Sequence, residues 1–154
     1  MKANNLKFKI LFLTMAAILL TAVSCKDEDD EDPVIDANVV FEAALNGVNE
    51  VPPNASTATG NATLTFDTLT KKFTIIVIYS GITATGAHIH LAPPDSTGGI
   101  VFPFDPPLTS PINYTSPVLT DAQEADLFGE MYYVNIHSAA YPGGEIRGQL
   151  RRED

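Results

Sequence analysis

The sequence predicts an all-β fold, an antiparallel sandwich or barrel with one short helix as a connector. Three observations lead to this fold class. Apolar and polar side chains alternate with a period of two through most of the chain after residue 37. Proline- and glycine-rich segments separate these alternating stretches. The remaining helical pattern is short, so the seven expected strands must supply the core.

The expected strands are short, and most have one apolar face. In ATLTFD, Leu64 and Phe66 alternate with Thr63 and Thr65, which places the two large apolar side chains on one face. KFTIIVIYS is apolar on both faces and is expected to be a central strand, with an outer apolar patch or a partner contact as the alternative. The seven segments are VVFEAALN, ATLTFD, KFTIIVIYS, AHIHL, GGIVFPF, MYYVNIHS and GEIRGQLR.

The connections have local causes. YPGG at 141–144 predicts a type II turn with Pro142 and Gly143 in its centre, which would join MYYVNIHS and GEIRGQLR as a hairpin. Gly143→Val is then expected to destabilise the turn.

A helix is expected over 121–128, where Thr120 and Gln123 have the spacing of a capping box. PFDPPLTSPINYTSPV carries five prolines and is expected to be a surface loop with at most an edge strand.

The chain divides into three parts by composition. Residues 1–24 have a basic start followed by the apolar run 10–23, which predicts a signal peptide and is too short to span a bilayer comfortably. Cys25, the only cysteine, ends the segment TAVSC and excludes an internal disulfide. Residues 25–36 include six consecutive acids, which repel one another and predict a solvated tether. Residues 37–154 are expected to form one domain.

The first two parts resemble those of bacterial lipoproteins. TAVSC is similar to a lipobox, which implies a lipid on Cys25, and the alternative is a cysteine in an ordinary or uncleaved signal segment. KDEDDED is similar to the export tag of Bacteroidetes-type lipoproteins, and the alternative is a generic spacer. The resemblance implies an exported protein that is lipid-anchored to the outer membrane, facing either the periplasm or the cell surface.

Charge and missing motifs exclude several function classes. From residue 37 onward there are 5 basic and 12 acidic residues, a net charge of −7, which disfavours nucleic acid as a partner. The sequence contains no glycine-rich phosphate loop, no GxSxG elbow and no CxxC pair. Whether the protein is an enzyme stays open, and these absences favour a non-enzymatic domain.

Three histidines are candidate metal ligands. His88 and His90 project to the same face of the expected strand AHIHL, and His137 on another strand could supply a third nitrogen. Three imidazoles with an open position suit zinc or copper. Glu145 is the candidate fourth ligand, or the acceptor that orients one imidazole. The alternative is that all three histidines are structural and bonded to backbone carbonyls or carboxylates.

GEIRGQL forms a second group of polar residues. Glu145, Arg147 and Gln149 are expected on one face, and Gly148 would allow a neighbouring backbone to approach closely. Arg147 is expected to pair with Glu145 or with Glu50 as a structural clamp.

Four segments together resemble the CHRD domain, the module named after chordin and found in many bacterial secreted proteins. They are FEAALNGVNEVPP, GNATLTFD, GAHIHLAPP and YYVNIHSAAYPGGEIRGQL. The resemblance implies an extracytoplasmic, immunoglobulin-like β-sandwich. Chordin antagonises bone morphogenetic proteins, whereas the bacterial relatives generally lack an assigned activity. The positions that match the family's motifs are Glu50, His88, His90, Asn135, His137, Gly144, Glu145, Arg147 and Gly148.

The HxH strand with a later strand histidine is also similar to Cu/Zn superoxide dismutase, itself a β-sandwich. That enzyme's copper needs four histidines, and this chain has three, so only a single copper or zinc ion remains an option. The sequence therefore leaves two functions open. The first is a non-enzymatic lipoprotein, anchored through Cys25, that binds an extracellular protein or glycan. The alternative is a copper- or zinc-binding module or minimal metalloenzyme that uses the three histidines.

Overall fold

The computed structural model describes residues 37–153, which lie in one compact unit. The predicted signal peptide, Cys25 and the acidic tether fall outside the described residues. The elements are β1 (Asn38–Asn46), the 3-10 turn η1 (Gly47–Asn49), β2 (Thr59–Asp67), β3 (Lys72–Ser80), β4 (Ala84–Leu91), β5 (Ile100–Pro103), β6 (Ile112–Thr115), α1 (Asp121–Phe128), β7 (Tyr132–Ser138), β8 (Ile146–Gln149) and β9 (Arg151–Arg152).

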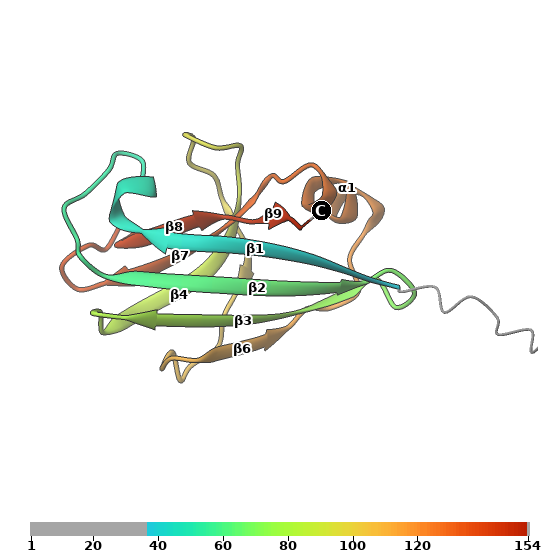
Figure 1. Ribbon diagram of the computed structural model, residues 1–154, viewed down its shortest axis with the longest axis horizontal. Coiled ribbons are helices and arrows are strands. Elements are labelled where there is room, and N and C mark those ends of the chain that lie inside the picture. Colours follow the sequence, from blue (N-terminus) through green and yellow to red (C-terminus); the bar gives the residue numbers. More distant parts are fainter. Residues whose placement is uncertain (1–36, 154) are drawn as a thin grey trace, which may run out of the picture. The chain divides into compact units, whose positions relative to one another are not determined.

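The strands form one antiparallel, strongly curled sheet, a half-barrel (Figure 1). Its order is β5-β4-β7-β8-β1-β2-β3-β6, and β9 pairs with β1. The mostly-β class with one short helix is confirmed. The division into two separate sheets that an immunoglobulin-like or superoxide-dismutase-like sandwich requires is not seen within residues 37–153. Curling lets one sheet bury a common apolar interior without a second layer.

The core fills the inside of the curl and follows the alternation in the sequence. Leu64 and Phe66 of β2 face Phe73 and Ile75 of β3 across paired positions, and all four are at most 1% exposed. Helix α1 closes one end of this core, where Leu127 is fully buried. The predicted capping box is present, because Thr120 accepts from the Gln123 backbone while the Gln123 side chain accepts from the Thr120 backbone.

β3 lies between β2 and the four-residue edge strand β6, not at the centre of the sheet. Its second apolar face is therefore open: Ile76 is 48% and Ile78 59% exposed. The alternative of an outer apolar patch is thus the one the structure shows. β6 itself comes from the proline-rich segment, which confirms that this segment contributes no more than an edge strand.

The turn between β7 and β8 is present but differs from the predicted type. The Gly144 amide donates to the Tyr141 carbonyl at 3.1 Å, as a four-residue turn requires. A type II turn needs a positive φ at Gly143, whereas the positive φ, 135°, occurs at Gly144. A Cβ on Gly143 would meet nothing within 4 Å, while one on Gly144 would lie 2.6–2.7 Å from Asn135 and Glu50. The glycine that the turn needs is therefore Gly144.

Within the described part of the chain, no helix has the length and apolar character to span a bilayer.

Candidate metal centre

The three histidines converge on the face of β4 and β7 that points away from the core. The register pairs His88 with Asn135, His90 with Tyr133 and Gly86 with His137. One ring nitrogen from each histidine lies within 4.8 Å of those of the other two. The sequence predicted this gathering from the shared strand face, and the structure confirms that the cluster could hold a metal ion.

Backbone carbonyls fix the orientation of two of the rings. Nδ1 of His90 lies 3.0 Å from the Gly98 carbonyl oxygen, and Nδ1 of His137 lies 3.0 Å from that of Pro142. A carbonyl only accepts, so each Nδ1 must carry the proton and donate. Each Nε2 then keeps a free lone pair, which is the form that binds a metal.

Three of the other ring nitrogens are buried and have no partner in the described part of the protein. Nε2 of His90, Nε2 of His137 and Nδ1 of His88 are buried and make no hydrogen bond. A buried polar atom left without a partner is unusual in folded proteins and costs on the order of 1–3 kcal/mol. The cluster therefore offers three buried atoms that a shared ligand could satisfy.

The surroundings favour the neutral form of two of these imidazoles, His88 and His90. Burial, together with the neighbouring His137 and His90, lowers the pKa of His88 to about 4. Burial also lowers the pKa of His90, although its hydrogen bond to Gly98 acts in the opposite direction. Both rings therefore offer lone pairs at neutral pH without first losing a proton.

Tyr133, the cross-strand partner of His90 on β7, packs against the histidine cluster. Its ring stacks on His90 with a centroid distance of 5.0 Å and an interplanar angle of 9°. Cζ of Arg147 lies 3.5 Å from the centroid of the same ring. The ring of His90 is thus held by both the Gly98 carbonyl and an aromatic face. Strand alternation places Tyr133 on the same face as His137, but its stacking on His90 and the two carbonyls were not predicted, because only the fold brings them to the histidines.

Glu145, the predicted fourth ligand, does not join the cluster. Its Oε1 accepts a hydrogen bond of 2.7 Å from Ser56 Oγ, a contact that anchors the segment after η1. Asn54 from the same segment donates to the carbonyls of Gly144 and Glu145. These polar contacts hold the hairpin that carries the Pro142 carbonyl.

Three other polar residues of the family motifs, Glu50, Asn135 and Arg147, lie near the histidine cluster. Asn135 Nδ2 donates to Glu50 Oε2 at 3.5 Å. Arg147 donates to the Ser96 carbonyl at 2.7 Å and to Gln149 Oε1 at 3.4 Å. The predicted ion pair of Arg147 is absent, because no carboxylate of residues 37–153 lies within 4.0 Å of its guanidinium.

Comparison with known proteins gives one match. The profile of the CHRD domain family matches residues 41–150. This range includes the three histidines and the polar residues Glu50, Asn135 and Arg147. No curated protein and no solved structure matches the chain.

Proposed function

This chain belongs to the CHRD domain family, and we propose that its domain binds one zinc or copper ion through His88, His90 and His137. One observation carries the proposal. Backbone carbonyls occupy the Nδ1 atoms of His90 and His137, and the freed Nε2 atoms are buried beside a partnerless nitrogen of His88. This is the arrangement in which outer partners orient metal-binding imidazoles.

The competing interpretation treats the histidines as structural residues. Structural histidines in a folded protein satisfy both ring nitrogens with hydrogen bonds. Here one buried nitrogen of each ring lacks a partner, and hydrogen bonds occupy only two of the six ring nitrogens, Nδ1 of His90 and Nδ1 of His137. A metal ion would satisfy all three nitrogens at once.

The ligand set narrows the choice of metal. Three neutral imidazoles without a thiolate suit zinc and copper, and they disfavour magnesium and calcium, which prefer oxygen ligands. Three protein ligands leave at least one coordination position for a ligand from solution.

Metal content tests the proposal. The full chain is purified without a polyhistidine tag, stripped with a chelator, loaded with zinc or copper and desalted. We expect one ion per chain, and stabilisation of about 4 kcal/mol at a free metal concentration of ~1,000 times Kd. His90→Gln and His137→Gln should lose the ion, whereas Glu145→Gln should retain it.

Apo-protein melting provides the folding control for these variants. A variant that melts cooperatively without metal, yet shows no rise in Tm on loading, has lost the site and not the fold. Substoichiometric metal on the wild type after desalting would contradict the proposal. The proposal would also be contradicted if His90→Gln and His137→Gln both retained as much metal as the wild type.

We also propose that the domain is exported and anchored by a lipid on Cys25. The proposal is supported by the sequence TAVSC behind a basic and apolar start. Cells fed labelled fatty acid should label the wild type but not Cys25→Ala, and the label should sediment with the outer membrane. A wild-type protein that stays unlabelled in the soluble periplasmic fraction would refute the anchor, without bearing on the metal.

A further inference from the structure

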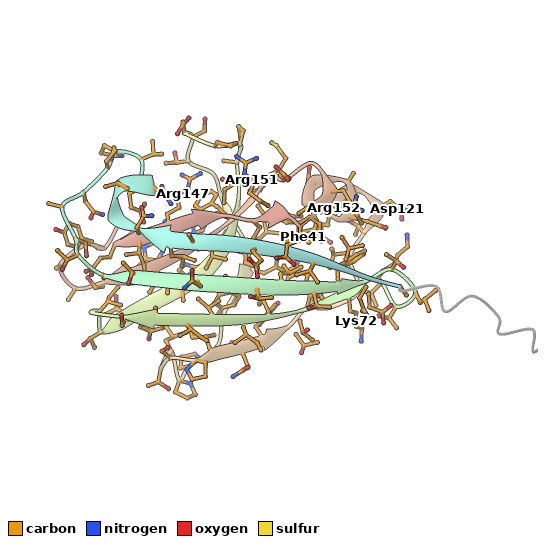
Figure 2. The ribbon with its side chains drawn as sticks, in the orientation of Figure 1. Phe41, Lys72, Asp121, Arg147, Arg151 and Arg152 are labelled. Carbon is orange, nitrogen blue, oxygen red and sulfur yellow. The ribbon has the colours of Figure 1, made fainter. Side chains whose placement is uncertain are left out.

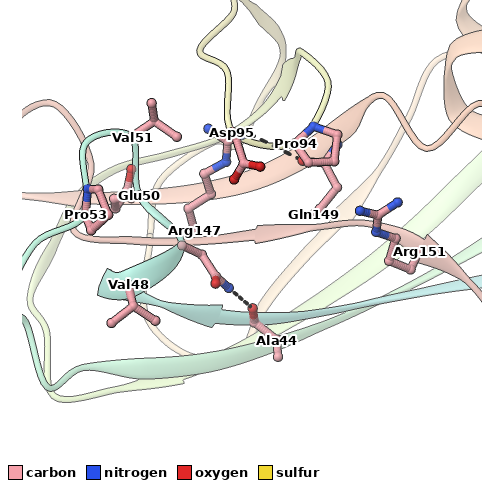
Figure 3. A pocket seen from close by; sticks show the side chains of 11 residues that line it. Ala44, Val48, Glu50, Val51, Pro53, Pro94, Asp95, Arg147, Gln149 and Arg151 are labelled. Carbon is pink, nitrogen blue, oxygen red and sulfur yellow. Dashed lines mark hydrogen bonds between the residues drawn. The ribbon is translucent and has the colours of Figure 1, made fainter.

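A pocket of about 420 Å³ lies beside the metal centre, between η1 and the loop after β4 (Figure 3). This volume falls in the range of small-molecule sites. Its apolar lining consists of Val48, Val51 and Pro53 on the η1 side and Pro94 on the side of the loop after β4 (Figure 3). Arg147 rises from β8 toward the loop that carries Pro94 and Asp95 (Figure 3). An apolar lining with a few fixed polar groups is typical of a ligand site.

Arg147 provides a fixed positive charge in this pocket, where Glu50 and Asp95 act on it through space without forming a direct ion pair. Its side chain is only 3% exposed, and no carboxylate of the described chain lies within 4.0 Å of it. Its guanidinium is held by the Ser96 carbonyl, by Gln149 and by the ring of Tyr133. A buried guanidinium without a hydrogen-bonded ion-pair partner is costly, and its planar donors match a carboxylate.

Glu50 provides a second polar anchor in the same pocket. The residue is 7% exposed, and its Oε1 is buried without a hydrogen-bond partner. Burial raises the pKa of this carboxyl group to about 7, although Arg147 and Asn135 act in the opposite direction. Oε1 lies next to Gly144 and Asn135, and the carboxyl group of Glu50 lines the pocket together with that of Asp95.

We propose that this pocket binds an α-amino or α-hydroxy acid with an apolar side chain. The ligand's carboxylate lies at Arg147, its amino or hydroxyl group donates to Glu50, and its side chain packs against the apolar lining that contains Val48 and Val51. The shared chemistry is a carboxylate with a hydrogen-bond donor on the adjacent carbon. This inference does not depend on the metal, because none of its contacts uses a histidine.

A set of six-carbon compounds tests each part of the ligand separately. Isothermal titration calorimetry is run on the full chain with L-leucine, 2-hydroxy-4-methylpentanoate, 4-methylpentanoate and leucinamide. We expect one or both of the first two to bind at least about tenfold more tightly than 4-methylpentanoate, which lacks the donor. Leucinamide, which lacks the carboxylate, should not bind. The first two compounds distinguish an amino acid from a hydroxy acid.

Substitutions of Arg147 and Glu50 test which part of the ligand each residue binds. Arg147→Lys should weaken binding at least about tenfold, because lysine cannot form the bidentate pair. Glu50→Gln should reduce the preference for the α-substituted acids over 4-methylpentanoate. Arg152→Lys is the matched control: it lies on β9 toward α1, outside the pocket lining, and should bind as the wild type does (Figure 2).

Three results would overturn the inference. They are no binding of any carboxylate, binding of leucinamide as tight as that of the better of the two α-substituted acids, and an equal loss of affinity in Arg147→Lys and Arg152→Lys. If Arg147→Lys does not fold, Asp95→Asn and Glu50→Gln still report on the pocket, and unchanged affinities for all acids in both would refute it. Asp95 has a φ of 62°, which asparagine also tolerates.

Discussion

At the scale of single residues, backbone carbonyls and burial decide the chemistry of each polar group. Gly98 and Pro142 assign the tautomers of His90 and His137, because a carbonyl oxygen accepts only from a protonated nitrogen. Burial acts in opposite directions on acids and bases. It lowers the pKa of His88 and raises that of Glu50, and in both cases it favours the neutral form.

Glu50 should make folding stability depend on pH. Its pKa is about 7 in the folded state and 4.5 without the surroundings, so the folded protein binds more protons between these values. Stability from this group is fully present below pH 4.5 and is lost as the pH rises through 7. Glu50→Gln, which stays neutral, should therefore gain about 1–3 kcal/mol over the wild type between pH 5 and pH 8.

Urea unfolding of both metal-free proteins at the two pH values measures this difference. Histidines with a lowered pKa have the opposite dependence, but the two proteins share them, so their contribution cancels in the comparison. A constant difference between wild type and variant from pH 5 to 8 would show that Glu50 is not held in its neutral form.

At the scale of elements, the loop between β4 and β5 connects the histidine cluster with the pocket. Its backbone carbonyls accept from His90, from Arg147 and from Gln149, through Gly98, Ser96 and Ala92 respectively. The loop can take this path because Gly98 has no side chain. A Cβ there would lie 1.7 Å from the Leu91 carbonyl oxygen.

Gly98→Ala should therefore displace the loop and weaken metal binding. The added methyl group cannot fit against the backbone of β4, so the carbonyl that orients His90 must move. Loss of such an outer partner lowers metal affinity by about 10–100-fold. The adjacent Gly99→Ala is the control, because a Cβ on Gly99 meets nothing within 4 Å. Competition with a chromogenic chelator measures both affinities, and equal values would contradict this role of the loop.

At the scale of the whole domain, the pairing of β1 with β8 and with β9 joins the histidine-bearing strands to the rest of the sheet. β4, β7 and β8 lie on one side of this seam and β1, β2 and β3 on the other. The ladder pairs Asn46 with Arg147, and Gly148 lets the strands approach. A Cβ on Gly148 would lie 2.7 Å from the Ala44 carbonyl oxygen.

Gly148→Ala should destabilise the entire domain, because the extra methyl group forces this seam apart. We expect a loss of about 1–3 kcal/mol in the free energy of unfolding, the usual cost of overpacking. Gly143→Ala introduces the same methyl group into open space and should change stability by less than about 1 kcal/mol. Urea denaturation followed by circular dichroism compares the two, and a Gly148→Ala protein as stable as Gly143→Ala would refute the close approach.

Local patterns in the sequence were enough to predict the strands, the capping box of α1 and the shared face of His88 and His90. Each of these features depends on residues a few positions apart. The strands and the histidine face follow from the alternation of side chains along a strand, and the cap follows from the three-residue spacing of Thr120 and Gln123. The position of Gly144 shows the limit of such local reasoning. YPGG predicted a turn correctly, but the contacts of Gly144 with Asn135 and Glu50, distant in sequence, decide which glycine is required.

The sequence by itself determined an all-β domain of the CHRD family with three histidines on strand faces, because alternation and motifs are properties of neighbouring residues. Only the tertiary structure decided that the strands form one curled sheet, that Glu145 faces Ser56 instead of the histidines, and that Arg147 and Glu50 share a pocket. These outcomes depend on long-range pairing and on loops crossing the sheet. No local pattern specifies which distant carbonyl or carboxylate a side chain will meet.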